Sequence, residues 1–133
     1  MDAKIEKLKN MNKKAIKNGD IPVSAMIIKN NKIISKSYNK KYKNSNPIHH
    51  AEILAIIKAC KKLKTTNLID CELITTLKPC IMCESVIAEV KIRKVYYILE
   101  KNKEVNKKIE YIKINKENDI FKKELKKFFE LKR

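Results

Sequence analysis

The chain has 133 residues, 44% of them hydrophobic, and a formal net charge of +17. This length suits one domain with a sizeable core, so we expect residues 1–133 to form a single domain with one active site. The hydrophobic residues are spread along the chain, which excludes a disordered protein, and no apolar run reaches the roughly 18 residues of a membrane span. The N-terminus mixes acidic and basic residues and lacks a signal-peptide core, so we expect a cytoplasmic protein that does not bind a membrane.

The positive charge comes almost entirely from lysine, because only Arg93 and Arg133 are arginines among the 32 basic residues. Such a charge attracts polyanions, of which a nucleic-acid backbone is the obvious candidate. Abundant lysine, isoleucine and asparagine are also typical of AT-rich codons, and base-edge recognition favours arginine. Charge alone therefore leaves nucleic-acid binding and compositional drift open.

The first half of the chain is expected to form a helix, a β-hairpin and a second helix. The first helix ends at Asn18 and Gly19, where glycine can take the left-handed conformation. Residues 21–28 form an apolar run typical of a buried central strand, and the Asn30-Asn31 turn leads to an outer strand at 32–38. Polar residues 39–47 form a loop before a helix at about 50–63. The residues on the apolar face of the first helix are Ile5, Leu8, Met11, Ala15 and Ile16.

The second half predicts strands at residues 71–77 and 95–99, a charged connection at 101–108, and a short strand around 109–114. Pro79 marks the start of a helix between the first two of these strands. The apolar side of that helix is formed by Ile81, Met82, Val86, Ile87 and Val90. The stripe of a C-terminal helix is formed by Phe121, Leu125, Phe128 and Phe129, with Leu131 at its edge. Helices alternating with apolar strands indicate a layered α/β domain.

Two short segments carry metal-binding residue types: HAE at residues 50–52 and PCIMC at residues 79–83. Both lie where a loop enters a predicted helix. A structural zinc site needs a fourth protein ligand, and the spare candidate His49 would point about 100° away from His50. Three ligands, His50, Cys80 and Cys83, with one open position are the arrangement of a catalytic zinc.

The expected chemistry follows from that metal set. Zinc lowers the pKa of bound water towards neutrality, so a zinc-bound hydroxide is available as a nucleophile. Glu52 is close to the metal without being a ligand, so it can take the water's proton and return it to a ring nitrogen and the departing amine. This H-x-E and P-C-x-x-C combination is the signature of zinc-dependent nucleobase deaminases. The other two cysteines, Cys60 and Cys71, are expected to be free, small buried residues.

The chain resembles the bacterial tRNA-specific adenosine deaminases and their eukaryotic catalytic counterparts. Residues 19–25 (GDIPVSA) are similar to the family's (E/D)-(V/I)-P-V-G-A, and Asn39 precedes His50 by the family's eleven positions. Residues 46–53 (NPIHHAEI) resemble D-P-T-A-H-A-E-I, and residues 76–83 (TLKPCIMC) resemble T-L-E-P-C-x-M-C. The ending FFELKR at 128–133 is similar to the family's F-F-x-x-x-R tail.

This resemblance implies a three-layer α/β/α cytidine-deaminase-like fold with a central mixed five-stranded sheet, Zn²⁺ as cofactor and a homodimer. It implies hydrolysis of adenosine to inosine at the wobble position of a tRNA, with the anticodon stem-loop as partner. Asn39 would hydrogen-bond the extruded base, and backbone groups near Ala51 would read it too.

Two departures from the family pattern leave other functions open. Lys78 replaces the glutamate that usually precedes Pro-Cys, and after Leu99 the family's G-A-x-D segment and glycine-rich loop are missing. One alternative is a deaminase of a free base, nucleoside or nucleotide of the guanine or cytosine type. The other is a non-catalytic zinc-binding subunit that presents RNA to a partner. Glu52 argues against this alternative, because a structural zinc site needs no proton shuttle.

Overall fold

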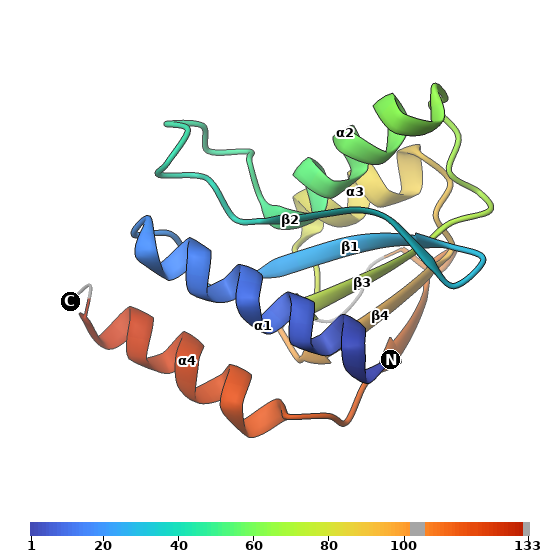
Figure 1. Cartoon of the computed structure of the whole chain (residues 1–133). Helices are drawn as coiled ribbons and strands as arrows, with labels where there is room; N and C mark the ends of the chain where they lie inside the picture. Colours follow the sequence, from blue (N-terminus) through green and yellow to red (C-terminus); the bar gives the residue numbers. More distant parts are fainter. Residues whose placement is uncertain (102–105, 132–133) are drawn as a thin grey trace.

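The computed structural model describes residues 1–101 and 106–131. In those residues four helices and five strands alternate along the chain (Figure 1). The helices are α1 (Asp2–Lys17), α2 (Ala51–Leu63), α3 (Ile81–Glu89) and α4 (Asn118–Leu131). The strands are β1 (Ser24–Lys29), β2 (Lys32–Tyr38), β3 (Glu72–Leu77), β4 (Lys94–Leu99) and β5 (Glu110–Lys113).

The strands form one mixed sheet in the order β2-β1-β3-β4-β5. β1 pairs antiparallel with β2 and β3, whereas β3, β4 and β5 run parallel to one another. The carboxyl ends of β3 and β4 therefore meet at one edge of the sheet. In parallel sheets this edge is where ligands bind.

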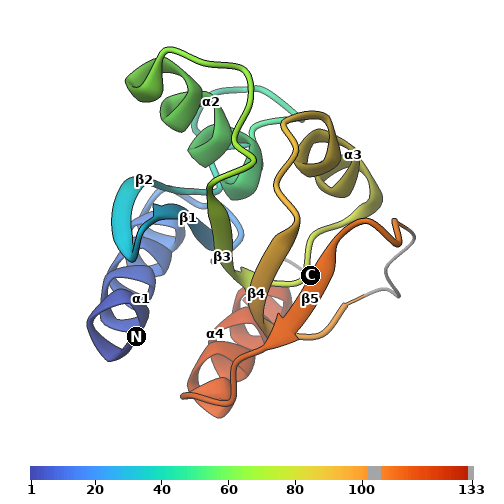
Figure 2. The same cartoon turned by 90° about the vertical axis from the view of Figure 1, so that its right-hand side faces the viewer.

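Helices cover both faces of the sheet, with α2 and α3 on one side and α1 and α4 on the other (Figures 1 and 2). The buried strand β1 shows how the sequence supports this arrangement, because successive side chains of a strand point to opposite faces. Ala25 and Ile27 belong to the core cluster beneath α2 and α3. Met26 and Ile28 belong to the cluster with α1 and α4. The predicted three-layer α/β/α architecture is confirmed.

The turn predictions are confirmed by backbone angles. Asn30 and Asn31 have φ of 52° and 64°, the pair of positive values that a tight hairpin requires. Gly19 has φ of 76° directly after α1, and its N–H bonds to the carbonyl of Ile16.

Several sequence predictions were too broad. β1 begins at Ser24 instead of residue 21, because Pro22 has no N–H for a sheet ladder and Val23 N–H bonds locally to the Ile21 carbonyl. Four residues assigned to apolar faces are exposed, because each helix packs on the sheet along a narrower stripe than its apolar residues span. They are Ile16, Ile81, Phe129 and Leu131.

Part of the connection predicted at residues 101–108 lies at 102–105, outside the described residues, as do the last two residues of the C-terminal tail. The chain on either side of 102–105 is described, so the place where β4 ends is known. In the part of the chain that the structure describes, no helix combines the length and apolar character needed to cross a bilayer.

Candidate active site

Two helix starts on the same face of the sheet carry the predicted metal ligands. His50 is the N-cap of α2, and Cys80 is the N-cap of α3. Both N-cap residues have extended backbone angles, so their side chains lie at the beginning of the helix axis and not along its flank. Cys83 lies in the first turn of α3 and is fully buried. The two junctions bring together residues that are about 30 positions apart in the chain.

The ligand atoms of His50, Cys80 and Cys83 all lie within 4.8 Å of one another. Nδ1 of His50 is 3.8 Å from Sγ of Cys80 and 3.3 Å from Sγ of Cys83. A tetrahedral zinc with Zn–S near 2.3 Å and Zn–N near 2.0 Å separates its ligand atoms by about 3.5–3.8 Å. The three side chains therefore fit a zinc ion and could hold one. Cys60 and Cys71 are free thiols, as expected, but only Cys71 is buried and Cys60 is half-buried.

The cluster already favours a thiolate. Hydrogen bonds from the Cys83 thiol and the His50 ring lower the pKa of Cys80 to about 3. The same hydrogen bond, together with burial, raises the pKa of Cys83. The bond with Cys80 also raises the pKa of His50. A divalent cation replaces the shared proton in such a pair, because metal ligands must be deprotonated.

Glu52 lies in the first turn of α2, next to this cluster, and is 4% exposed. Burial raises the pKa of its carboxyl group, while its own backbone N–H and the His50 charge act in the opposite direction. A carboxyl group with a raised pKa can both accept and release a proton near neutral pH, which is the property that general acid–base catalysis requires.

The cluster opens into a cavity of about 420 Å³ at the carboxyl ends of β3 and β4. His50, Glu52 and Cys80 line it. Asn39 lines it too and is 5% exposed, and its side-chain oxygen accepts a hydrogen bond from Lys41 N–H at 3.0 Å. The cavity is thus lined by four of the predicted site residues. Cys83 and Ala51 are fully buried and are not among the residues that line the cavity, and Ala51 belongs to the core cluster under α2.

Lys78 occupies the wall between β3 and Cys80, and only 6% of its surface is exposed. Its ammonium group lies 3.6 Å from Glu100 Oε1 and 4.9 Å from the ring centres of Tyr97 and Tyr111. Tyr97 donates a hydrogen bond to the other oxygen of Glu100 at 2.8 Å. The lysine charge is therefore held by a carboxylate and two aromatic faces.

Several residues that line the cavity were not singled out from the sequence as site residues. Lys41 and Glu100 come from loops, and Leu125 and Phe129 come from α4, which lies in the opposite layer. Phe129 lies on the apolar side of α4, and the structure leaves it 47% exposed. An apolar side chain left outside the core at a helix end is a candidate cavity wall.

The model of the family described as "Cytidine and deoxycytidylate deaminase zinc-binding region" matches residues 2–99. The chain belongs to this family. The matched segment contains the whole His50, Cys80 and Cys83 cluster, so the zinc-binding character of the cytidine and deoxycytidylate deaminase region extends to this chain.

Curated relatives within the family differ in the substrate they are named for. The tRNA-specific adenosine deaminase of Aquifex aeolicus is 45% identical over 85 residues, which cover 64% of this chain and 56% of that protein. The guanine deaminase of Bacillus subtilis is 39% identical over 79 residues, which cover 59% of this chain and 51% of that protein. The chain thus matches little more than half the length of either relative.

Solved structures share the fold. A structure from studies of A-to-I editing by tRNA:A34 deaminases superposes with a TM-score of 0.76 at 24% identity, covering 83% of this chain and 95% of that one. The Bacillus subtilis guanine deaminase superposes with a TM-score of 0.66 at 34% identity, covering 71% of this chain and 61% of that one. Both agree with the mixed five-stranded sheet described above.

Proposed function

We propose that the protein hydrolyses adenosine to inosine at the wobble position of a tRNA anticodon. The observation that carries this proposal is the position of buried Glu52 beside the His50, Cys80 and Cys83 cluster, in a cavity that Asn39 also lines. The identity to tRNA-specific adenosine deaminases supports the choice of substrate. A tRNA substrate also favours a cytoplasmic enzyme.

In this proposal His50, Cys80 and Cys83 would hold the zinc ion, and zinc in such a site supplies a nucleophile from water at neutral pH. Glu52 would take a proton from the attacking water and deliver it to the ring nitrogen of adenine. Glu52 would then take the proton of the hydroxyl group newly bonded to the ring carbon and pass it to the exocyclic amine, which leaves as ammonia while the carbonyl of inosine forms. Its burial keeps the carboxyl group apart from bulk water during both transfers.

Asn39 would recognise the base. Its side-chain oxygen is engaged by Lys41 N–H, so we propose that its amide nitrogen donates to an acceptor on the base. Backbone groups near Ala51 would complete the recognition. A base held by these groups must leave its stack, because the amine cannot be reached inside one. We further propose that the protein acts as a homodimer, as the resemblance to the family implies.

The direct test is to incubate the purified protein with a tRNA that carries adenosine at the first anticodon position and to sequence the product. Inosine reads as guanosine, so the proposal expects conversion at that position alone. A tRNA with guanosine there is the matched control. Unchanged reads, together with release of ammonia from a free base, would overturn the tRNA assignment.

A second candidate function is deamination of free guanine. The observation that favours it is the similarity to Bacillus subtilis guanine deaminase, both in sequence and in structure at 34% identity. Ammonia release from guanine, compared with release from adenosine in tRNA, separates the two candidates. A non-catalytic zinc subunit would release ammonia from neither.

A further inference from the structure

The charge of the chain is unevenly distributed. Residues 21–69 contain ten lysines and a single acidic residue, Glu52, which is buried in the active site. The preceding carboxylate, Asp20, is also fully buried. The surface made by β1, β2, the following loop and α2 therefore carries positive charge that no exposed carboxylate from the same segment offsets.

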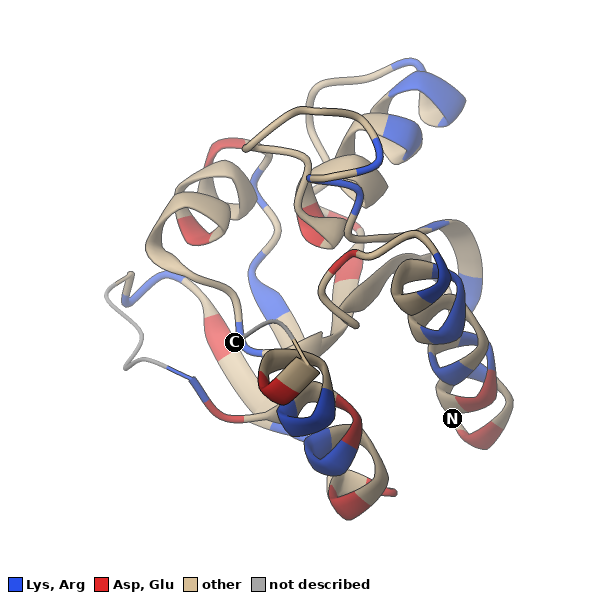
Figure 3. Ribbon diagram, turned by 90° about the vertical axis from the view of Figure 1, so that its left-hand side faces the viewer, with Lys and Arg blue, Asp and Glu red and all other residues tan. Residues whose placement is uncertain are grey.

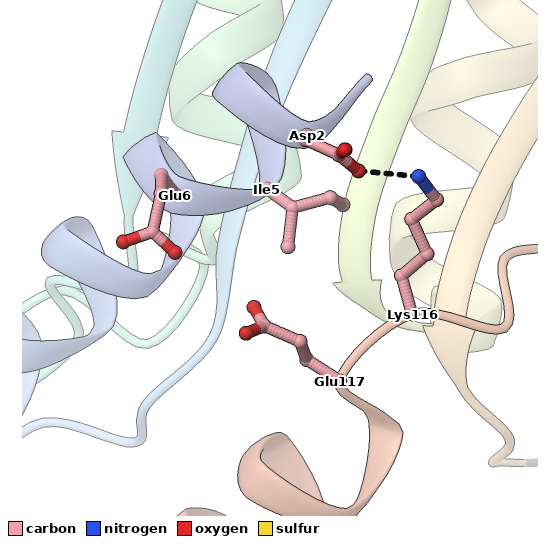
Figure 4. A pocket seen from close by; sticks show the side chains of 5 residues that line it. All are labelled: Asp2, Ile5, Glu6, Lys116 and Glu117. Atoms are coloured by element: carbon pink, nitrogen blue, oxygen red, sulfur yellow. Dashed lines mark hydrogen bonds and ion pairs between the residues drawn. The ribbon is translucent and has the colours of Figure 1, made fainter.

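The opposite layer differs, since α1 and α4 carry both signs of charge (Figure 3). Near the start of both helices, the carboxylate of Asp2 pairs with Lys116 at one wall of a cavity of about 380 Å³ (Figure 4). Lys9 on α1 pairs with Glu6 at 3.1 Å and with Glu117 at 3.2 Å. Lys9 and Lys116 are thus neutralised by carboxylates of their own layer.

Two tyrosines lie among the lysines of the positive surface. We call the following group the basic patch: Tyr38, Tyr42, Lys36, Lys40, Lys43 and Lys58. The ammonium of Lys40 lies 4.7 Å from the centre of the Tyr38 ring, and Lys43 donates to the Tyr38 hydroxyl at 3.3 Å. Lys58 donates to the backbone carbonyl of Lys36 at 3.2 Å, which joins α2 to the edge strand β2.

The pKa shifts of two residues in the basic patch agree with a surface that carries mainly positive charge. Burial raises the pKa of the Tyr38 hydroxyl, but the hydrogen bond from Lys43 and the charge of Lys40 outweigh burial, so the pKa is lowered. Burial and then the charge of Lys40 lower the pKa of Lys58. Cations that repel one another in this way gain from binding an anion between them.

The basic patch adjoins the active-site cavity through the loop after β2. Asn39 and Lys41 line the cavity, whereas Lys40, Tyr42 and Lys43 from the same loop belong to the patch. Tyr42 is 54% exposed. A chain that places one base in the cavity would therefore have its adjacent phosphates and bases within reach of the patch.

We propose that the basic patch binds the single-stranded RNA that flanks the target base, with lysines contacting phosphates and tyrosines stacking on neighbouring bases. This inference rests on the proposed function, since it assigns a surface to the RNA part of the substrate. Single-stranded RNA combines a phosphate for each lysine with a flat base for each tyrosine. An acidic protein surface offers carboxylates to the lysines but does not place a flat base beside each charge.

Two matched double variants test the lysines. Lys40→Gln with Lys43→Gln removes two charges from the patch, and Lys122→Gln with Lys126→Gln removes two exposed charges from α4. All proteins also carry Glu52→Gln, so that the RNA is not converted during the measurement. Affinity for a labelled stem-loop with a target adenosine is measured by fluorescence anisotropy at several salt concentrations. Loss of two phosphate contacts lowers the slope of log affinity against log salt by about 1.4 for the patch variant. The α4 variant is expected to keep the slope.

Tyr42 is tested by a pair of substitutions in the same background. Tyr42→Ala is expected to weaken RNA binding roughly five- to 150-fold, because a base loses its stacking surface. Tyr42→Phe retains the ring and is expected to bind like the parent protein. Equal binding by both variants would contradict stacking on Tyr42.

The outcomes separate this inference from the proposed function. If the α4 variant loses as much affinity as the patch variant and its salt slope falls as much, RNA binds by overall charge. The proposal that RNA binds at the basic patch is then overturned. If the patch variants lose RNA affinity but wild-type protein forms no inosine, the patch stands and the proposed function fails. If the parent protein does not bind the stem-loop, both fail.

Discussion

Nδ1 of His50 lies 3.3 Å from Sγ of Cys83, although 33 positions separate the two residues in the chain. Each comes from a different helix start, and both helices lie on the same face of the sheet. The distance is therefore set by the packing of α2 beside α3 on the shared core, and not by local sequence. A metal ion bound there would join the two helices.

The first prediction concerns metal content. Cys83→Ala is expected to reduce zinc from about one ion per chain to nearly none, because two remaining side chains do not complete a catalytic zinc set. Cys71→Ala is the matched control, since Cys71 is also buried but is a free thiol away from the cluster. The zinc content of both purified proteins is measured by atomic emission. Full zinc occupancy in Cys83→Ala would rule out the proposed ligand set.

The second prediction separates metal binding from proton transfer. Glu52→Gln is expected to keep zinc and lower turnover by about 10²- to 10⁴-fold, the usual contribution of a general acid–base residue. Glutamine has nearly the shape of glutamate, so the buried side chain keeps its packing. Zinc content and single-turnover conversion are measured on the same preparation. Substantial activity in this variant would refute the role of Glu52.

The sequence was sufficient to predict the elements of the site, because each motif stands at a helix start that local patterns identify. Apolar runs located β1 and β3, and Pro79 located the beginning of α3. The mixed, five-stranded character of the sheet was predicted from the family resemblance. The chemistry depends on residue types at these positions, and such types can be recognised without coordinates.

The rest of the cavity depends on contacts between distant segments. Lys78 was identified from the sequence as a departure from the family pattern. Its partners, Glu100 and the rings of Tyr97 and Tyr111, come from β4, β5 and the residue after β4. Such partners are set by strand register, which a single sequence does not specify. The same limit applies to Phe129, which lines the cavity and is 47% exposed because of the way α4 packs on the sheet.

The third prediction concerns Asp20, which is fully buried. Its carboxylate accepts hydrogen bonds from the backbone N–H groups of Tyr42 at 2.6 Å and Lys43 at 3.1 Å, so it fixes the loop that also carries Asn39. Asp20→Ala is expected to lower the free energy of unfolding by about 3 kcal/mol, because two charge-assisted hydrogen bonds are lost. Asp20→Asn retains one acceptor and is expected to lose about half as much. Urea denaturation of the parent protein and the two variants measures the order of their free energies of unfolding.

The same two variants should affect substrate recognition. A displaced loop moves Asn39 and Lys41, which line the cavity, but is expected to leave the proposed zinc ligands in place. We therefore expect KM to rise more than kcat falls, with unchanged zinc content. A fall in kcat alone would show that Asp20 does not act through this loop.

The fourth prediction concerns a contact between α1 and α4. Asn12 is fully buried and donates from Nδ2 to Glu124 Oε1 at 3.0 Å, while its Oδ1 has no hydrogen-bond donor among the described residues. Glutamine at position 124 can accept from Asn12 and donate to it as well. Glu124→Gln is therefore expected to raise the free energy of unfolding by about 1 kcal/mol at pH 7.

The pH dependence of that gain follows from the direction of the pKa shift. Burial raises the pKa of Glu124 above its ordinary value of 4.5, and the hydrogen bond from Asn12 only partly opposes this. A raised carboxyl pKa means that the folded protein is favoured when Glu124 is protonated, so this stability is present below pH 4.5 and is lost as pH rises through the folded-state pKa. The advantage of Glu124→Gln should then be small in acid and grow towards neutral pH. Glu130→Gln, exposed on α4, should change stability by less than about 0.5 kcal/mol at any pH. Thermal unfolding of the three proteins across this pH range tests the prediction, and a gain that does not vary with pH would show that Glu124 ionisation is not its source.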